Sequence, residues 1–347
     1  MLEIIDINLL LFRGFELLGF FLFFLLLLRE IFKKNGGRVY ELLSCAVFGV
    51  ILEAINISIA HTYYYSDIFL VNILDVPLAI GLGWAVIIYC AMLLSDQYNT
   101  PWQVRPFTDA FIVILTDLVL DVVAIRIGFW YWKIPFNQEW YGVPFENLVG
   151  WIFVAISFSF VIRFIRTLNP KRFLTKLLMV FSPLIAYIGL CLQLAIYGIV
   201  TILPYQINYW NNLINFNCQL DFNLLYQPEV QLWKGLIFTF IMTVLINIFI
   251  FVAVKYRKNY LKKFDALSFF SLTALHIYFI FALFVSGTYV QCPIFIIIAF
   301  LILLIHTLIH FIPYINDLLK IKAAKKARKL IIEKTKKIKN VIDENLR

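Results

Sequence analysis

The sequence has little charge, few cysteines and few histidines. Charged residues make up 15% of its 347 positions, whereas a soluble globular domain carries about 25%. Its five cysteines lie at positions 45, 90, 191, 218 and 292 without paired spacing, which excludes a zinc ribbon or a CxxC redox site. Its four histidines are too few for a histidine-box desaturase, and the Walker, Rossmann, GxSxG and HExxH signatures are absent.

Apolar residues are abundant instead, at 62% of the chain with 35 phenylalanines. They form long continuous runs rather than alternating patterns, which favours membrane-spanning helices over a barrel. We therefore predict an all-α, polytopic integral membrane helix bundle in the cell membrane. Its spans, about nine in number, are expected near residues 7–28, 40–60, 70–94, 107–127, 148–165, 177–203, 235–254, 267–287 and 293–312.

Lysine and arginine are concentrated in alternate loops, such as the loop with Arg29, Lys33, Lys34 and Arg38. The positive-inside rule then predicts that the N-terminus lies outside and the C-terminus inside. We divide the chain into a transmembrane domain, 1–316, and a basic amphipathic cytoplasmic tail, 317–347. The net charge of +9 fits contact between this tail and anionic lipid headgroups better than it fits nucleic acid. Cys218 and Cys292 fall in predicted outside loops, where they could pair.

Carboxylates inside the predicted spans are the most informative residues, because a buried acid in a membrane usually marks a site. Asp117 and Asp121 are four residues apart in the stretch Asp-Leu-Val-Leu-Asp, so they share one face of a helix. Two such acids in a low dielectric cannot both ionise easily, and one is expected to keep a proton for general-acid chemistry. The alternative, neutralisation of the pair by Arg126 or another buried cation, stays open from spacing alone.

The predicted topology gathers further polar residues in the outer half of the membrane, beside a cluster of aromatic residues. The cluster is either an interfacial aromatic belt or the wall of a cavity for an apolar substrate, where π faces steady a developing cation. The acids and amides concerned are Glu53, Asp67, Asp75, Asp121, Glu146 and Asn147, and the aromatic residues include Tyr63, Tyr64, Tyr65, Phe129, Trp130, Tyr131, Trp132, Trp140 and Tyr141.

Three motifs in this region resemble the membrane carotenoid biosynthesis protein family, which includes bisanhydrobacterioruberin hydratase and related carotenoid hydratases. They are Ile-Leu-Thr-Asp-Leu-Val-Leu-Asp at 114–121, Gly-Phe-Trp-Tyr-Trp at 128–132 and Tyr-Gly-Val-Pro-Phe-Glu-Asn-Leu-Val-Gly-Trp at 141–151. The Tyr-rich segment ending at Asp67 and the segment 76–84 are similar in kind and order. The resemblance covers roughly residues 45–165.

The resemblance implies hydration of the terminal double bond of an acyclic carotenoid or a related long isoprenoid, without a cofactor or metal ion. We expect Asp117 or Asp121 to donate the proton while the other aspartate orients it, and Glu53 to complete the catalytic set. Glu53, Asp67 or Asn147 is expected to position water. The other substrate-binding residues are expected to be Tyr65, Trp130, Trp132, Tyr141 and Glu146. Two alternatives remain open: a prenyltransferase that uses the Asp-rich motif with magnesium, and a non-catalytic protein that binds or transports an isoprenoid or lipid.

Overall fold

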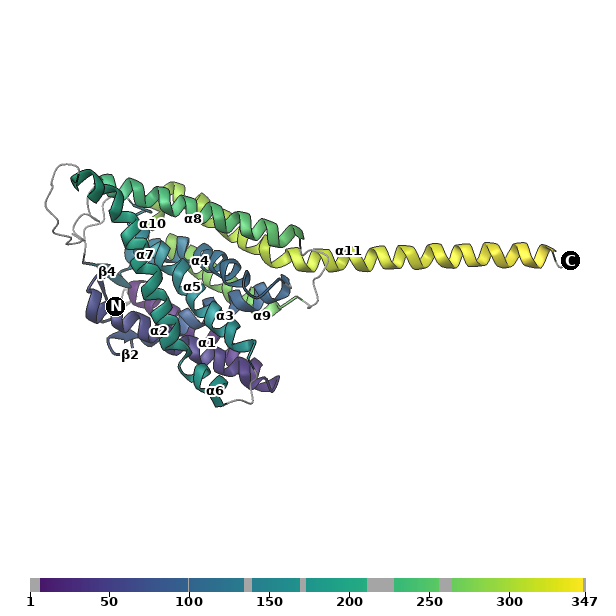
Figure 1. Ribbon diagram of the computed structural model, residues 1–347, viewed down its shortest axis with the longest axis horizontal. Coiled ribbons are helices and arrows are strands. Elements are labelled where there is room, and N and C mark those ends of the chain that lie inside the picture. Colours follow the sequence, from purple (N-terminus) through teal and green to yellow (C-terminus); the bar gives the residue numbers. More distant parts are fainter. Residues whose placement is uncertain are drawn as a thin grey trace, which may run out of the picture.

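The chain folds into a bundle of long helices with one helix projecting far from it (Figure 1). The computed structural model describes residues 7–98, 100–133, 139–168, 173–210, 228–255 and 264–345. The elements follow in the order α1 (Ile7–Phe32), α2 (Gly36–Ile55), the π-helical turn η1 (Asn56–Ala60), β1 (Tyr63–Tyr65), β2 (Asn72–Ile73), β3 (Val76–Pro77), α3 (Leu78–Ser95), the 3-10 turn η2 (Asp96–Tyr98), α4 (Arg105–Ile127), β4 (Trp130–Trp132), α5 (Phe145–Arg166), α6 (Phe173–Val180), α7 (Ser182–Trp210), α8 (Pro228–Lys255), α9 (Ala266–Val285), α10 (Thr288–Gln291) and α11 (Pro293–Asn345).

The predicted all-α membrane bundle is confirmed. Within the described ranges, eight helices are long and apolar enough to cross a membrane, and they correspond to α1, α2, α3, α5, α7, α8, α9 and the first part of α11. The remaining predicted span, at 107–127, corresponds to α4, which is a helix of 23 residues. It is too polar to count among the eight because it carries Asp109, Asp117, Asp121 and Arg126. The protein is therefore a multi-pass membrane protein.

Helices α3 and α4 form the centre of the bundle, since nearly all of their residues are buried. Helix α4 packs against α3, α5, α8, α9 and α11, so other helices separate its acids from lipid. A polar helix tolerates membrane depth only when its charged groups face protein or a polar cavity. The surrounding helices therefore explain why a helix with three aspartates can lie at the centre of a membrane bundle.

Two predicted spans differ from the structure, and proline explains both. The third span was expected from residue 70, but α3 begins at Leu78, after the antiparallel pair β2–β3. Pro77 disfavours helical conformation in the residue before it, so the helix cannot extend backwards through Val76. The span expected at 177–203 is split into α6 and α7, which begins at Ser182. Pro183 follows directly, at a position where proline starts helices well.

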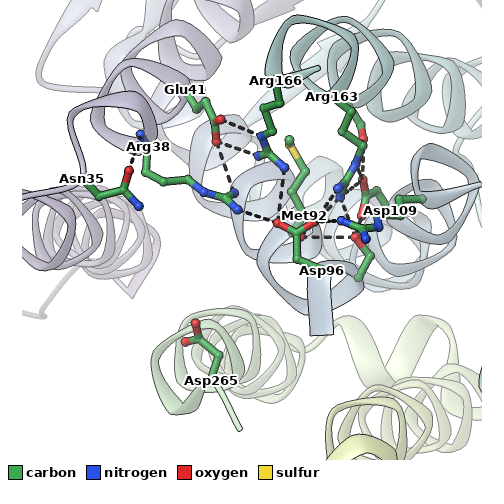
Figure 2. A network of polar contacts seen from close by, with 12 residues as sticks. Asn35, Arg38, Glu41, Met92, Asp96, Asp109, Arg163, Arg166 and Asp265 are labelled. Carbon is green, nitrogen blue, oxygen red and sulfur yellow. Dashed lines mark hydrogen bonds and ion pairs between the residues drawn. The ribbon is translucent and has the colours of Figure 1, made fainter. Parts of the chain in front are cut away.

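A buried network of arginines and acids fastens one end of the bundle (Figure 2). Arg163 of α5 is fully buried; its Nη1 lies 2.5 Å from Oδ1 of Asp96 and its Nη2 lies 2.8 Å from Oδ2 of Asp109. Ser95 donates to Asp109, and Ser159 does so at 2.5 Å. Three further arginines, Arg38, Arg105 and Arg166, complete the network by pairing with Asp96. Arg38 and Arg166 also pair with Glu41.

This network joins α2, η2, α4 and α5. We call it the arginine end of the bundle, and the opposite end, which carries β1 to β4, the strand end. The two ends differ in chemistry: charged pairs close the arginine end, whereas aromatic rings fill the strand end.

The projecting helix is α11, whose 53 residues correspond to about 80 Å at the usual helical rise. Its first part packs in the bundle, and the rest leads away from it, on the side opposite the strand end (Figure 1). The predicted tail at 317–347 thus continues a helix that starts within the membrane. The boundary at residue 317 stays a prediction. Most of the loop expected at 204–234, including Cys218, lies outside the described residues.

Candidate functional site

Close packing of α2 on α3 brings Glu53 and Trp84 together. A Cβ atom added to Gly49 would lie only 2.7 Å from Cβ of Trp84, and one added to Gly81 only 2.5 Å from Cγ2 of Val50. Glycines at such positions let membrane helices approach closely. One turn beyond Gly49, the buried carboxylate of Glu53 accepts a hydrogen bond from Nε1 of Trp84 at 2.7 Å and another from the Tyr63 hydroxyl.

The strands β1 and β4 place aromatic rings in front of this carboxylate. They pair antiparallel, with Tyr63 opposite Trp132, Tyr64 opposite Tyr131 and Tyr65 opposite Trp130. Alternate residues of a strand point to opposite faces, so one face carries Tyr63, Tyr65, Trp130 and Trp132 toward the bundle. The other face carries Tyr64 and Tyr131, which are 46% and 44% exposed. The strand period thereby separates cavity aromatics from surface aromatics.

Tyr63 and Tyr65 remain hydrogen-bond donors at neutral pH. Burial, with a smaller contribution from the charge of Glu53, raises the pKa of both hydroxyls well above the usual value for tyrosine. Neither phenol therefore ionises near Glu53 under physiological conditions. The carboxylate of Glu53 is held between the indole of Trp84 and the neutral hydroxyl of Tyr63.

The acid pair of α4 lies on the other side of the same space. Asp121 is 2% exposed, and Nδ2 of Asn147, at the start of α5, donates to its Oδ2. Asp117 lies one turn deeper, fully buried, and the two carboxyl groups interact with each other. Apart from the other acid of the pair, no donor among the described residues reaches either oxygen of Asp117 or Oδ1 of Asp121.

Arg126 does not neutralise this pair. Its Nη1 donates to the backbone oxygen of Val122 at 2.8 Å and its Nη2 to Sγ of Cys292 at 3.3 Å. Within the described ranges, neither Asp117 nor Asp121 takes part in an ion pair. The alternative of a buried cation beside the acids is therefore not realised by Arg126.

These groups line two neighbouring pockets, an inner part and an outer part, which share residues of their walls. The inner part, which we call the acid chamber, has a volume of about 50 Å³ and is lined by Glu53, Asp121 and Asn147 and by a largely apolar wall. The outer part, which we call the side groove, has about 270 Å³ and shares Glu53 and Asn147 with the chamber. The residues lining both parts are Glu53, Tyr63, Trp84, Trp132, Asn147 and Trp151.

The structure brings together six of the residues singled out from the sequence, all of which line the acid chamber: Glu53, Tyr65, Asp121, Trp130, Trp132 and Asn147. Asp117 stands behind Asp121 and does not line it. Three others lie elsewhere. Asp67 is exposed in the loop after β1, and Tyr141, with φ of 50°, contacts Phe295 at a ring distance of 5.0 Å. Glu146 lines the side groove but forms an ion pair with Lys234.

Glu146 and Lys234 belong to a small charged group at the strand end. Glu139 accepts the backbone N–H of Phe145 and lies 3.7 Å from Nζ of Lys234. Burial and the nearby charge of Glu146 raise the pKa of Glu139 to about 6. Glu146 is therefore engaged in an ion pair with Lys234 at the edge of the groove.

The chamber residues that were not in the predicted site include Tyr63, Trp84 and Trp151. The rings of Trp84 and Trp151 lie 3.9 Å apart between centroids. Trp84 was part of a family-like motif and Tyr63 part of the aromatic cluster, but neither carried a charge that marked it. The useful signal was strand alternation, which puts Tyr63 on the same face as Tyr65.

His306 and His310, which are four residues apart on α11, meet a third buried histidine, His276 of α9. Ring centroids lie 4.7 Å apart between His276 and His306 and 4.4 Å apart between His306 and His310. In the part of the chain that the structure describes, no group of three or more His, Cys, Asp or Glu residues is arranged to hold a metal ion.

The chain is similar to known proteins. The bisanhydrobacterioruberin hydratase of Haloarcula japonica is 29% identical over 147 residues, which cover 40% of this chain and 49% of that protein. The chain thus spans about half the length of this relative. No solved structure matches the chain. The sequence profile of the family described as "Carotenoid biosynthesis protein" matches residues 15–208, which is more than half of the 347 residues, and the chain belongs to that family.

Proposed function

We propose that this protein hydrates the terminal double bond of an acyclic carotenoid or a related long isoprenoid by acid-catalysed addition of water. The observation that carries the proposal is the acid chamber, where Asp121 and Glu53 face one aromatic cavity. Acid-catalysed hydration of an alkene needs a protonated acid, a positioned water and an environment that stabilises a carbocation. The chamber offers a group for each need.

The acid is the Asp117–Asp121 pair. Two neighbouring carboxyl groups, buried without a cation, avoid the cost of two charges by sharing one proton. Asn147 fixes one oxygen of Asp121, which orients this carboxyl group toward the chamber. Asp121 delivers the proton to the less substituted carbon of the double bond, and a tertiary cation forms on the other carbon.

Water then captures the cation. A chamber of about 50 Å³ admits a water molecule beside the reacting carbons, since a cavity needs only about 10–15 Å³ to hold one water. Glu53, held by Tyr63 and Trp84, accepts a hydrogen bond from that water, and the faces of Trp130 and Trp132 stabilise the cation. The water oxygen bonds to the cationic carbon, and the proton it loses restores the acid pair, so the reaction consumes only alkene and water.

The test replaces each acid of the pair by its amide. Asp121→Asn and Asp117→Asn are expected to lower hydrated product by a factor of about 10²–10⁴, the usual contribution of general-acid catalysis. Membranes containing each variant receive an acyclic carotene, and mass spectrometry follows the gain of one water. Equal protein levels and equal thermal stability in detergent control for folding. Unchanged product from both variants contradicts the assignment.

The same assay separates the alternatives. A prenyltransferase would turn over a prenyl diphosphate only with magnesium, and a binding or transport protein would return the carotene with its mass unchanged. Arg126 does not support the prenyltransferase alternative, because it donates hydrogen bonds to Val122 and Cys292 and not to Asp117 or Asp121.

We also propose that the protein lies in the cell membrane with its strand end outside and its arginine end inside. The distribution of lysine and arginine between alternate loops supports this orientation. The acid chamber then opens near the outer surface, where water is at hand.

A further inference from the structure

The side groove is larger than the acid chamber and borders lipid. Its wall includes Val154 of α5 together with Leu190 and Leu194 of α7. Leu194 is 37% exposed, and its helix shows lipid a row of apolar residues that includes Leu192 and Ile196, each 63% exposed. The groove therefore reaches the lipid-facing surface of the bundle at Leu194 of α7.

Two glycines keep this cavity open. Gly83 of α3 lines the acid chamber and Gly150 of α5 lines the side groove, and a Cβ atom added to either would have no heavy atom within 4 Å. This differs from Gly49 and Gly81, where an added Cβ would collide with the neighbouring helix. Helix packing thus requires glycine at positions 49 and 81, whereas the space in front of positions 83 and 150 is free for a bound molecule.

The volumes indicate how a long molecule would sit. The chamber's 50 Å³ corresponds to the space of a few water-sized groups, which suits one branched end of a chain and a water molecule. The 270 Å³ of the groove then receives the part of the chain that follows. The polar residues Asn56, Thr62 and Glu146 line the groove toward the strand end, and Glu53 and Asn147 line it beside the chamber. The side toward α7 is apolar.

We propose that the substrate is a linear isoprenoid that enters end-first from the lipid, with its terminal unit in the acid chamber and its chain leaving past Gly150 of α5 and Leu194 of α7. The inference rests on the proposed function and adds the path and the residue that controls it. Water reaches the chamber from the polar edge of the groove. Gly150 is then a specificity-determining position, because any large side chain there blocks the apolar path and leaves the acids untouched.

The test compares Gly150→Leu with Gly198→Leu. Gly198 lies on α7, has open space in front of it and lines neither part of the cavity, so it controls for the general effect of a new leucine in a membrane helix. Each variant receives a long acyclic carotene and, separately, a ten-carbon acyclic isoprenoid hydrocarbon with the same terminal double bond. Gly150→Leu is expected to lower turnover of the long substrate at least tenfold while turnover of the short one changes less than threefold. Gly198→Leu is expected to change neither.

A binding measurement keeps this inference separate from the proposed function. Trp84, Trp132 and Trp151 line the cavity, so a bound polyene should quench tryptophan fluorescence whether or not it reacts. Weaker quenching by the long carotene in Gly150→Leu than in Gly198→Leu supports the path even if no hydrated product forms in any variant. Equal quenching and equal long-chain turnover in the two variants overturn the path, and loss of product in Asp121→Asn then still supports hydration.

Discussion

At the scale of single residues, the environment of Glu53 decides what that carboxylate does. Its two identified donors come from different elements, Trp84 from α3 and Tyr63 from β1. A buried acceptor that loses one partner costs about 1–3 kcal/mol. The donors therefore fix the position of Glu53 in the chamber.

Replacing Tyr63 by phenylalanine tests this role. Tyr63→Phe removes one donor and leaves the ring against Trp132, so we expect about a tenfold loss of kcat with little change in KM, equivalent to about 1.4 kcal/mol in the transition state. Turnover of an acyclic carotene in detergent measures both constants.

The matched control is Tyr64→Phe on the neighbouring strand position, where the ring is 46% exposed and stacks on Tyr131. It is expected to keep full activity. Equal losses in the two variants, or a change confined to KM for Tyr63→Phe, would count against a positioning role for the hydroxyl.

The sequence predicted part of this site because helical spacing and membrane depth are readable from one chain. Asp117 and Asp121 had to share a helix face, and both are buried in α4. The contacts of Glu53 could not be predicted from the sequence, since they depend on how closely α2 approaches α3 at Gly49 and Gly81. Asp67 shows the opposite limit: proximity in sequence to the tyrosines did not bring its side chain into the cavity.

At the scale of elements, α4 stands in the bundle because its charges are distributed between two different environments. Asp109 is ion-paired at the arginine end, and Asp117 and Asp121 serve the chamber in the middle and at the strand end. The apolar runs predicted nearly every helix, since lipid imposes their length. The arginine network was not predicted, because Asp96, Asp109 and Arg163 come from three separate segments that only the packed bundle brings together.

Removing one member of this network is expected to be costly. Arg163→Met leaves Asp109 without a cation in a fully buried place, and breaking such a buried pair typically costs about 3–5 kcal/mol. We expect a large fall in the melting temperature of the protein in detergent.

The double variant Arg163→Met/Asp109→Leu is the informative comparison. Replacing both partners with apolar side chains removes the unpaired charge, so the double variant should melt above the single Arg163→Met variant. Asp96 keeps Arg38, Arg105 and Arg166 as partners in both proteins. A double variant that melts below Arg163→Met would contradict the view that the unpaired charge of Asp109 destabilises the single variant.

At the scale of the whole molecule, arginine and lysine are concentrated at one end of the bundle, and a layer of aromatic rings lies at the other. The end closed by Arg38, Arg105, Arg163 and Arg166 also carries the basic loop at 29–38, and α11 projects beyond it with exposed lysines such as Lys325 and Lys329. The strand end has Lys133 and a layer of aromatic rings, from Phe12 to Phe129. Cytoplasmic loops are enriched in lysine and arginine and interfaces in tryptophan and tyrosine, so this asymmetry predicts one orientation.

Cysteine labelling in intact cells tests that orientation. A membrane-impermeant maleimide should label Tyr64→Cys, whose side chain lies on the exposed face of β1, without any treatment of the cells. Lys329→Cys, on the exposed part of α11, should react only after the cells are permeabilised. The unsubstituted chain supplies the background from its own cysteines. If only Lys329→Cys were labelled in intact cells, the protein would have the opposite orientation. The acid chamber would then take its water from the cytoplasm instead of from outside.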